Sequence, residues 1–186
     1  MRTTLFARRP ARLILLATIG LVVPASSRAQ GYPFSQRSSV VQSVALTDVA
    51  VTYGRPAARG RVLFGGLVPW DSVWHPGADS ATRITFDHDV LVDDRPLRAG
   101  AYSVWLIPRE RLPWTFILSR AAHVFHKPYP GPAQDVLRLD VVPDSLSYMD
   151  TMAIYFPTVL RDSAVMRIHW GTTGVSVRVK APYRPQ

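Results

Sequence analysis

Short runs of alternating side chains, broken by proline and turn residues, restrict this chain to a β-rich fold. Alternation with a period of two puts successive side chains on opposite faces of an extended strand. Sixteen prolines are scattered through the chain, and no stretch of 12 or more residues carries a helical apolar stripe. The sequence therefore predicts an all-β, antiparallel, β-sandwich-like single domain. The runs that predict its strands are 40–45, 49–53, 82–86, 90–92, 101–107, 114–119, 136–142, 152–156, 164–170 and 175–180.

Turn residues between these runs predict short antiparallel connections. Asp93-Asp94 and Ala99-Gly100 bracket a short segment, which is typical of tight turns. The run from Gly171 to Gly174 predicts a hairpin that joins the last two strands. Residues 144–151 are compatible with a turn of helix.

The first 29 residues have the three-part pattern of a secretory signal peptide. Arginines without acids precede an apolar run over 13–23, and small residues follow up to Ala29. The run is too short for a permanent membrane-spanning helix. We therefore expect export to the periplasm or the exterior, with no integral membrane segment after cleavage. Residues 30–37 should form a flexible mature N-terminus, 38–181 the domain and 182–186 a tail.

Charge and cysteine content narrow the function classes. Five arginines lie in the signal segment, so cleavage lowers the net charge from +9 to +4, which does not favour nucleic acid as a partner. The chain has no cysteine, so disulfides and cysteine chemistry are excluded.

Residues 54–81 stand apart because they show little strand character. Loops of this length in a compact domain are usually functional or disordered. This one contains Phe64, Trp70 and Trp74 among several glycines. Since a disordered linker would lack such aromatics, we expect an ordered loop, packed across one end or edge of the sandwich.

The same segment carries a family resemblance. Its motifs are Tyr53-Gly54-Arg55-Pro56, Gly60-Arg61, Phe64-Gly65-Gly66-Leu67-Val68-Pro69-Trp70, Val73-Trp74 and Gly77-Ala78-Asp79-Ser80-Ala81-Thr82, followed by Ala99-Gly100-Ala101-Tyr102-Ser103, Trp114-Thr115 and Asp135-Val136-Leu137-Arg138. With these motifs the chain resembles the bacterial domain-of-unknown-function family 2911. The resemblance implies an exported β-rich protein without an assigned activity. Two positions depart from the family pattern: His75-Pro76 replaces an arginine after the tryptophan, and His126-Lys127 replaces Trp-Gly.

The loop supplies the candidate ligand-binding residues. The arginines near Gly54 and Gly60 could clamp an anion, or they could pair with Asp71 or Asp79 and attach the loop to the body. The aromatic residues could form a platform for a ligand or close one end of the core. The candidates are Tyr53, Arg55, Arg61, Trp70, Trp74, His75 and Asp79.

Catalytic and metal-binding patterns are weak. Asp87-His88-Asp89 and the pair His123 and His126 offer ligand atoms without a recognised spacing, so no metal and no cofactor are predicted. The leading hypothesis is a non-catalytic exported domain that binds a small molecule or an envelope partner. The alternatives are a hydrolase that uses His75 and Asp79 as acid/base partners, and a purely structural envelope protein.

Overall fold

The computed structural model describes residues 34–182, and within them the regular structure is β-strand apart from one short 3₁₀ turn. The predicted signal segment 1–29, residues 30–33 of the predicted flexible stretch and residues 183–186 of the tail lie outside the described residues. Within this range no helix is long and apolar enough to cross a membrane. The elements are β1 (Gln36–Val44), β2 (Thr47–Arg55), β3 (Arg83–Phe86), β4 (Val90–Val92), β5 (Arg95–Leu97), β6 (Gly100–Ile107), β7 (Trp114–Ser119), a 3₁₀ turn η1 (Pro132–Gln134), β8 (Asp135–Val141), β9 (Asp144–Val159) and β10 (Ser163–Lys180).

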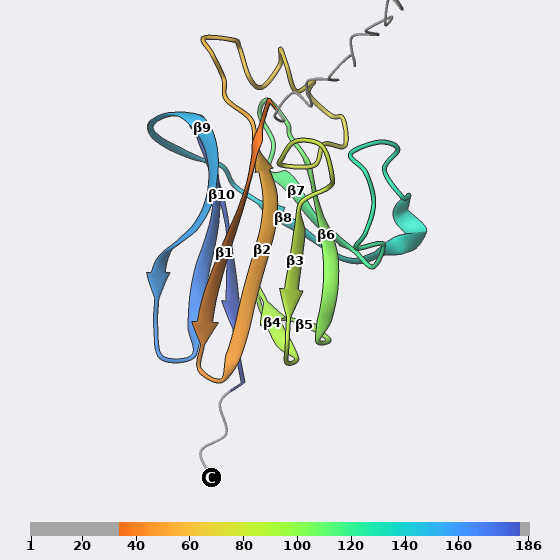
Figure 1. Cartoon of the computed structure of the whole chain (residues 1–186), viewed down its shortest axis with the longest axis vertical. Coiled ribbons are helices and arrows are strands. Elements are labelled where there is room, and N and C mark those ends of the chain that lie inside the picture. The colour runs from red at the N-terminus through yellow and green to blue at the C-terminus, as the bar shows by residue number, and fades with distance from the viewer. Residues whose placement is uncertain (1–33, 183–186) are drawn as a thin grey trace, which may run out of the picture. The chain divides into compact units, whose positions relative to one another are not determined.

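The strands form two antiparallel sheets (Figure 1). One sheet has six strands in the order β1-β2-β3-β6-β7-β8, and the other has four in the order β5-β4-β10-β9. The all-β, antiparallel, sandwich-like fold predicted from the sequence is thereby confirmed. The first strand begins at Gln36, inside the stretch expected to be a flexible N-terminus.

The core follows from the period-two pattern. In β2 the side chains of Val49 and Val51 are fully buried, whereas the intervening Ala50 and Thr52 are only partly so. The neighbouring strand repeats this with Ile84 and Phe86. Each large apolar side chain buried in this way contributes roughly 1.5–3 kcal/mol to folding.

The hairpin predicted at Gly171–Gly174 is wrong. β10 runs through this segment as one strand and pairs with β9, although its register shifts on both sides of Gly171. Gly171 has a φ of 61°, and a Cβ there would lie 2.8 Å from Leu63 Cδ1. The glycine therefore permits a β-bulge against which the Leu63 side chain of the loop packs, and it does not reverse the chain. Residues 144–151 are extended within β9, so the helical turn that the sequence allowed there does not form.

The Asp93-Asp94 turn is confirmed. Val92 pairs with Arg95, so these two residues alone join β4 to β5. Their φ values are 42° and 63°, as required in the two-residue turns that match strand twist.

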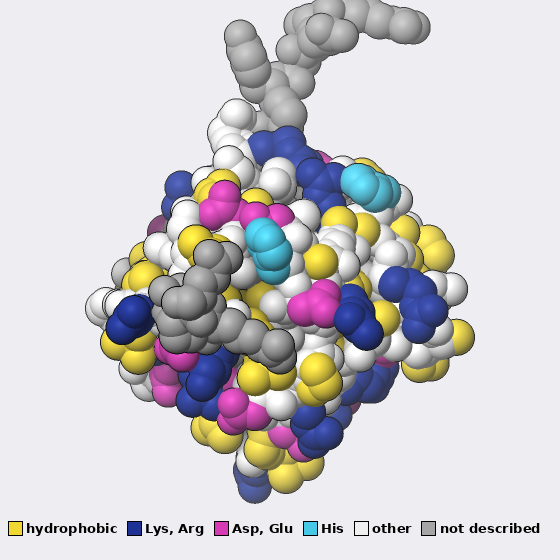
Figure 2. Space-filling view, turned by 90° about the horizontal axis from the view of Figure 1, so that it is seen from below, with side chains coloured by type: hydrophobic (Ala, Val, Ile, Leu, Met, Phe, Trp, Pro, Cys, Tyr) yellow, Lys and Arg dark blue, Asp and Glu magenta, His cyan; other side chains and the backbone are white. Residues whose placement is uncertain are grey.

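The segment between β2 and β3 is ordered and packed against the body, as predicted. The amide of Ala58 donates to the Asp150 carbonyl at 2.7 Å, and Trp74 and Leu106 exchange two backbone hydrogen bonds of 2.8 and 2.7 Å. In Figure 1 this segment lies at the end of the sandwich opposite the β1–β2 turn. Figure 2 views the end that carries the β1–β2 turn, where basic and acidic side chains are interspersed on the visible surface.

Candidate functional site

A cavity of about 350 Å³ lies where the long loop meets the sandwich. We call it the loop-end pocket. Four of the seven sequence candidates line it, namely Arg61, Trp74, His75 and Asp79. The complete lining is Phe34, Ser35, Pro56, Arg61, Leu67, Val68, Val73, Trp74, His75, Gly77, Ala78, Asp79, His126, Lys127 and Trp170.

His75 is a buried titratable side chain without a polar partner. It is 6% exposed, and its ring meets Trp105 edge-on at 5.9 Å between centroids. Neither ring nitrogen has a hydrogen-bond partner among residues 34–182, and Nδ1 is completely buried. A Cβ built on Gly77 would lie 3.2 Å from that nitrogen and 2.7 Å from Thr82 Oγ1, so the glycine lets the backbone approach the ring closely. An unpaired buried polar group costs about 1–3 kcal/mol, which makes this ring unusual in a folded core.

Burial and a second histidine together keep His75 neutral. The ring of His126 stacks on that of His75 with 5.8 Å between centroids and 25° between planes. Burial, and secondly the positive charge that His126 can carry, lower the pKa of His75 from 6.5 to about 4. His75 is therefore neutral at physiological pH and can exchange a hydrogen bond without bearing charge. His126 is held by Asp79, whose carbonyl accepts from the His126 amide at 3.1 Å and from its Nδ1 at 3.0 Å.

Two stacked tryptophans form an apolar wall. Trp74 and Trp170 lie 5.9 Å apart at 16°, and both line the pocket. Trp170 is fixed by donation from Nε1 to the Asp150 carbonyl at 3.0 Å, and Trp74 by its backbone bonds to Leu106. Because each ring is anchored to a strand, the wall is preformed.

The pocket also carries cations without carboxylate partners. Arg61 donates from Nε to the Ala58 carbonyl at 2.9 Å and from Nη2 to the Ala57 carbonyl at 2.7 Å. Within the described chain neither Arg61 nor Lys127 forms an ion pair, and the Asp79 carboxylate has no polar partner. The expectation that the loop arginines pair with Asp71 or Asp79 is therefore wrong. Backbone carbonyls near the arginines are the closer acceptors, and Asp71 lies 3.7 Å from Arg109 instead.

Three sequence candidates lie outside the pocket lining and support the fold. The hydroxyl of Tyr53 accepts from the Ile154 amide at 2.9 Å and links the two sheets. Arg55 donates from Nε to the Met152 carbonyl at 2.9 Å, which also reaches across the sheets. Trp70 packs beside Phe64, with 6.3 Å between the ring centroids.

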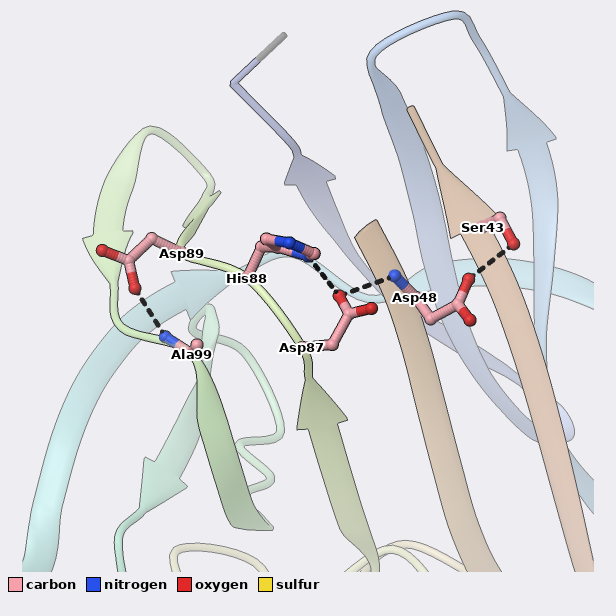
Figure 3. Close-up of polar contacts among 6 residues, drawn as sticks. All are labelled: Ser43, Asp48, Asp87, His88, Asp89 and Ala99. Atoms are coloured by element: carbon pink, nitrogen blue, oxygen red, sulfur yellow. Dashed lines mark hydrogen bonds and ion pairs between the residues drawn. The ribbon is translucent and has the colours of Figure 1, made fainter. Parts of the chain in front are cut away.

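The Asp87-His88-Asp89 run does not bring its three side chains together: His88 contacts Asp87, whereas Asp89 contacts Ala99 (Figure 3). Asp87 accepts from the Asp48 amide at 2.8 Å and contacts His88 Nδ1 at 2.9 Å, whereas Asp89 accepts from the Ala99 amide at 2.8 Å. The hydrogen bond from His88, first, and then that from Asp48 lower the pKa of Asp87. Throughout residues 34–182 no group of three or more His, Cys, Asp or Glu side chains is arranged to hold a metal ion.

Comparison with known proteins identifies the family. Residues 35–179 match the family described as Protein of unknown function (DUF2911). The chain belongs to this family. No curated protein and no solved structure matches the chain.

The DUF2911 match extends over nearly all of the described domain, including the loop-end pocket. His75 and His126 stack on each other in this DUF2911 domain. His126, Lys127 and Trp170 are pocket residues that the sequence did not single out as ligand-binding. They lie far from the loop along the chain, so no local sequence pattern indicates that they contact it.

Proposed function

We propose that this DUF2911 protein is a non-catalytic domain that binds a small organic ligand in the loop-end pocket. The supporting observation is the ring of His75, buried beside a cavity with both nitrogens lacking partners in the described residues. A site that combines an apolar wall with several fixed polar groups and one strongly perturbed pKa has the features of a ligand pocket.

The lining suggests the chemistry of the ligand. A planar or apolar body would contact Trp74 and Trp170, and a polar group on it would pair with the neutral His75 ring. Arg61 and Lys127 supply two cations against the single carboxylate of Asp79, which favours an anionic group at one end. A ring-bearing carboxylate satisfies all three requirements.

The geometry does not favour the hydrolase that would use His75 and Asp79. The two side chains share no hydrogen bond in the described structure, so nothing orients the imidazole as a base. With a pKa of about 4, His75 would also accept protons poorly at neutral pH. Binding without catalysis requires neither the hydrogen bond nor the basicity.

Thermal unfolding in the presence of candidate ligands tests the proposal. Benzoate and indole-3-acetate serve as ring-bearing carboxylates, with glucose and Zn²⁺ as other chemistries. A ligand present at 100 times its Kd adds about 2.7 kcal/mol of stability, which raises the Tm of a domain of this size by roughly 5–10 °C. Arg61→Ala should cost no more than about 1 kcal/mol, because its hydrogen bonds are local, yet abolish the response.

Arg95→Gln is the matched control, since it removes one exposed charge outside the pocket and should leave the response intact. The proposal fails if neither carboxylate raises the Tm, or if Arg61→Ala and Arg95→Gln respond alike. A large loss of stability in Arg61→Ala, without any ligand response in the unmodified protein, would support the purely structural alternative.

We further propose that the domain acts outside the cytoplasm, after cleavage following Ala29. The signal pattern of residues 1–29 supports this location. Expression of the full chain in a Gram-negative host, followed by fractionation and mass spectrometry, should recover a protein that begins at Gln30 in the periplasm or the medium. Recovery of the uncleaved chain from the cytoplasm would contradict it.

A further inference from the structure

A second cavity, of about 340 Å³, lies beside Arg37 and Arg83. These arginines alternate along their strands with side chains that face inward, such as Ile84, so both lie on the face of the six-stranded sheet away from the core. The segment 122–125 borders the same cavity. We call this cavity the basic pocket; its lining is Arg37, Ser80, Ala81, Arg83, Ala122, His123, Val124 and Phe125.

The basic pocket is lined by charges of one sign. No carboxylate belongs to its lining among residues 34–182. The guanidinium of Arg37 forms no hydrogen bond or ion pair with the described part of the chain. Since none of its N–H groups is engaged by a described residue, the planar donor fork of this guanidinium is available to an anion in the cavity.

Arg83 and His123 are joined in a way that adds another donor. Arg83 Nη1 lies 3.0 Å from His123 Nδ1. A guanidinium only donates, so Nδ1 must accept and the ring proton of a neutral His123 resides on Nε2. The ring is thereby held as a hydrogen-bond donor, alongside the remaining N–H groups of Arg83 and the hydroxyl of Ser80.

A narrow two-stranded ribbon separates the basic pocket from the loop-end pocket. Ser80 pairs with Phe125, and on either side the Ala81 amide donates to Val124 at 3.0 Å and the His126 amide to Asp79 at 3.1 Å. Ser80 and Phe125 line the basic pocket, whereas the next residues along, Asp79 and His126, line the loop-end pocket. The two cavities therefore use different side chains.

We propose that the basic pocket is a second binding site, for a small multivalent oxyanion such as a phosphate-bearing or polycarboxylate molecule. Arginine forks and a histidine N–H match the several oxygen acceptors that such an anion offers. The site is independent of the ligand proposed for the loop-end pocket, because no side chain lines both cavities.

Titration of the protein with pyrophosphate, and separately with citrate, tests this site by calorimetry and NMR at low ionic strength. We expect saturable binding with shifts of the His123 ring and the Arg37 and Arg83 Nε–H signals. The double variant Arg37→Gln/Arg83→Gln should weaken binding at least ~10-fold, since it removes the charge-assisted hydrogen bonds of both guanidinium groups. A preference between the two probes distinguishes phosphate from carboxylate as the favoured group.

The double variant Arg95→Gln/Arg111→Gln loses the same charge away from the basic pocket and should bind within about twofold of the unmodified protein. Arg61→Gln, in the loop-end pocket, should also leave binding unchanged. The proposal is overturned if both double variants weaken binding equally, if no saturation occurs, or if the anions shift the signals of the loop-end pocket instead. The His123 signal decides the question in the unmodified protein, so the test survives poor folding of a variant.

Discussion

Replacing His75 with glutamine should remove a large part of the acid sensitivity of this domain. The folded-state pKa of His75 is lowered to about 4, mainly by burial, whereas the unfolded chain titrates near 6.5. A lowered pKa means that the unfolded state takes up the proton first as the pH falls. The stability associated with the neutral ring is therefore complete above pH 6.5 and is lost progressively between about pH 6.5 and 4.

The magnitude follows from those two pKa values. At pH 5 the ratio of protonated to neutral imidazole is about 30 for a histidine in the unfolded chain. For His75 in the folded domain the same ratio is only about 0.1. Counting neutral and protonated forms together, protonation favours the unfolded state by a factor of about 33 and the folded state by only about 1.1. The quotient of these factors, about 30, corresponds to about 2 kcal/mol of unfolding free energy lost between pH 7.5 and pH 5 because of this one residue. Such a loss is a substantial fraction of the stability of a typical domain.

Urea unfolding at pH 7.5 and pH 5 measures the effect. The unmodified protein should lose about 2 kcal/mol more than His75→Gln over this interval. In His126→Gln the excess should become smaller but persist, because burial remains as the main cause of the lowered pKa. Equal pH dependence in the unmodified protein and His75→Gln, or an NMR titration of the His75 ring near pH 6.5, would refute the reasoning.

Three further substitutions test the packing around the site. Gly77→Ala places a methyl group 2.7 Å from Thr82 Oγ1, which donates to the Pro76 carbonyl. It should cost about 1–3 kcal/mol in urea unfolding, and a loss below about 0.5 kcal/mol would show that Thr82 is not held against Gly77 as described. Gly171→Ala places a side chain at a φ of 61° and 2.8 Å from Leu63 Cδ1. It should cost about 2 kcal/mol or more of unfolding free energy and speed amide hydrogen exchange in the loop. Unchanged exchange would argue against the contact of Leu63 with Gly171 as what holds the loop to β10. Tyr53→Phe leaves the Ile154 amide without its hydroxyl acceptor and should cost about 1–3 kcal/mol of unfolding free energy while preserving any ligand response. Loss of that response at unchanged stability would indicate that Tyr53 contacts the ligand.

The sheet architecture was predictable because it depends on local alternation. Val49, Val51 and Tyr53 follow the period that the burial in β2 shows. The failure at Gly171–Gly174 has a physical cause: glycines that permit a bulge and glycines that permit a reversal look the same in sequence. Only the presence of Leu63 against Gly171 distinguishes the two.

The site was predictable in part for a similar reason. Arg61, Trp74, His75 and Asp79 lie close together in one distinctive loop, and they line one pocket. Trp170 comes from β10, so its place against Trp74 depends on how the sheets pack. Tyr53 and Arg55 carry the same family motif as the pocket residues, yet their polar atoms are engaged by backbone groups of Ile154 and Met152. A motif alone does not distinguish a ligand contact from an internal hydrogen bond.

A fragment screen read by protein NMR tests the central claim most directly. With the indole signal of Trp74 and the ring signals of His75 assigned, the protein is titrated with a library of ring-bearing fragments, with and without a carboxylate. We predict that carboxylate-bearing fragments shift both residues together, and that His75→Gln weakens the shift at Trp74. Fragments that leave both signals unchanged, or that perturb Trp74 equally in His75→Gln, would contradict a binding site built around His75.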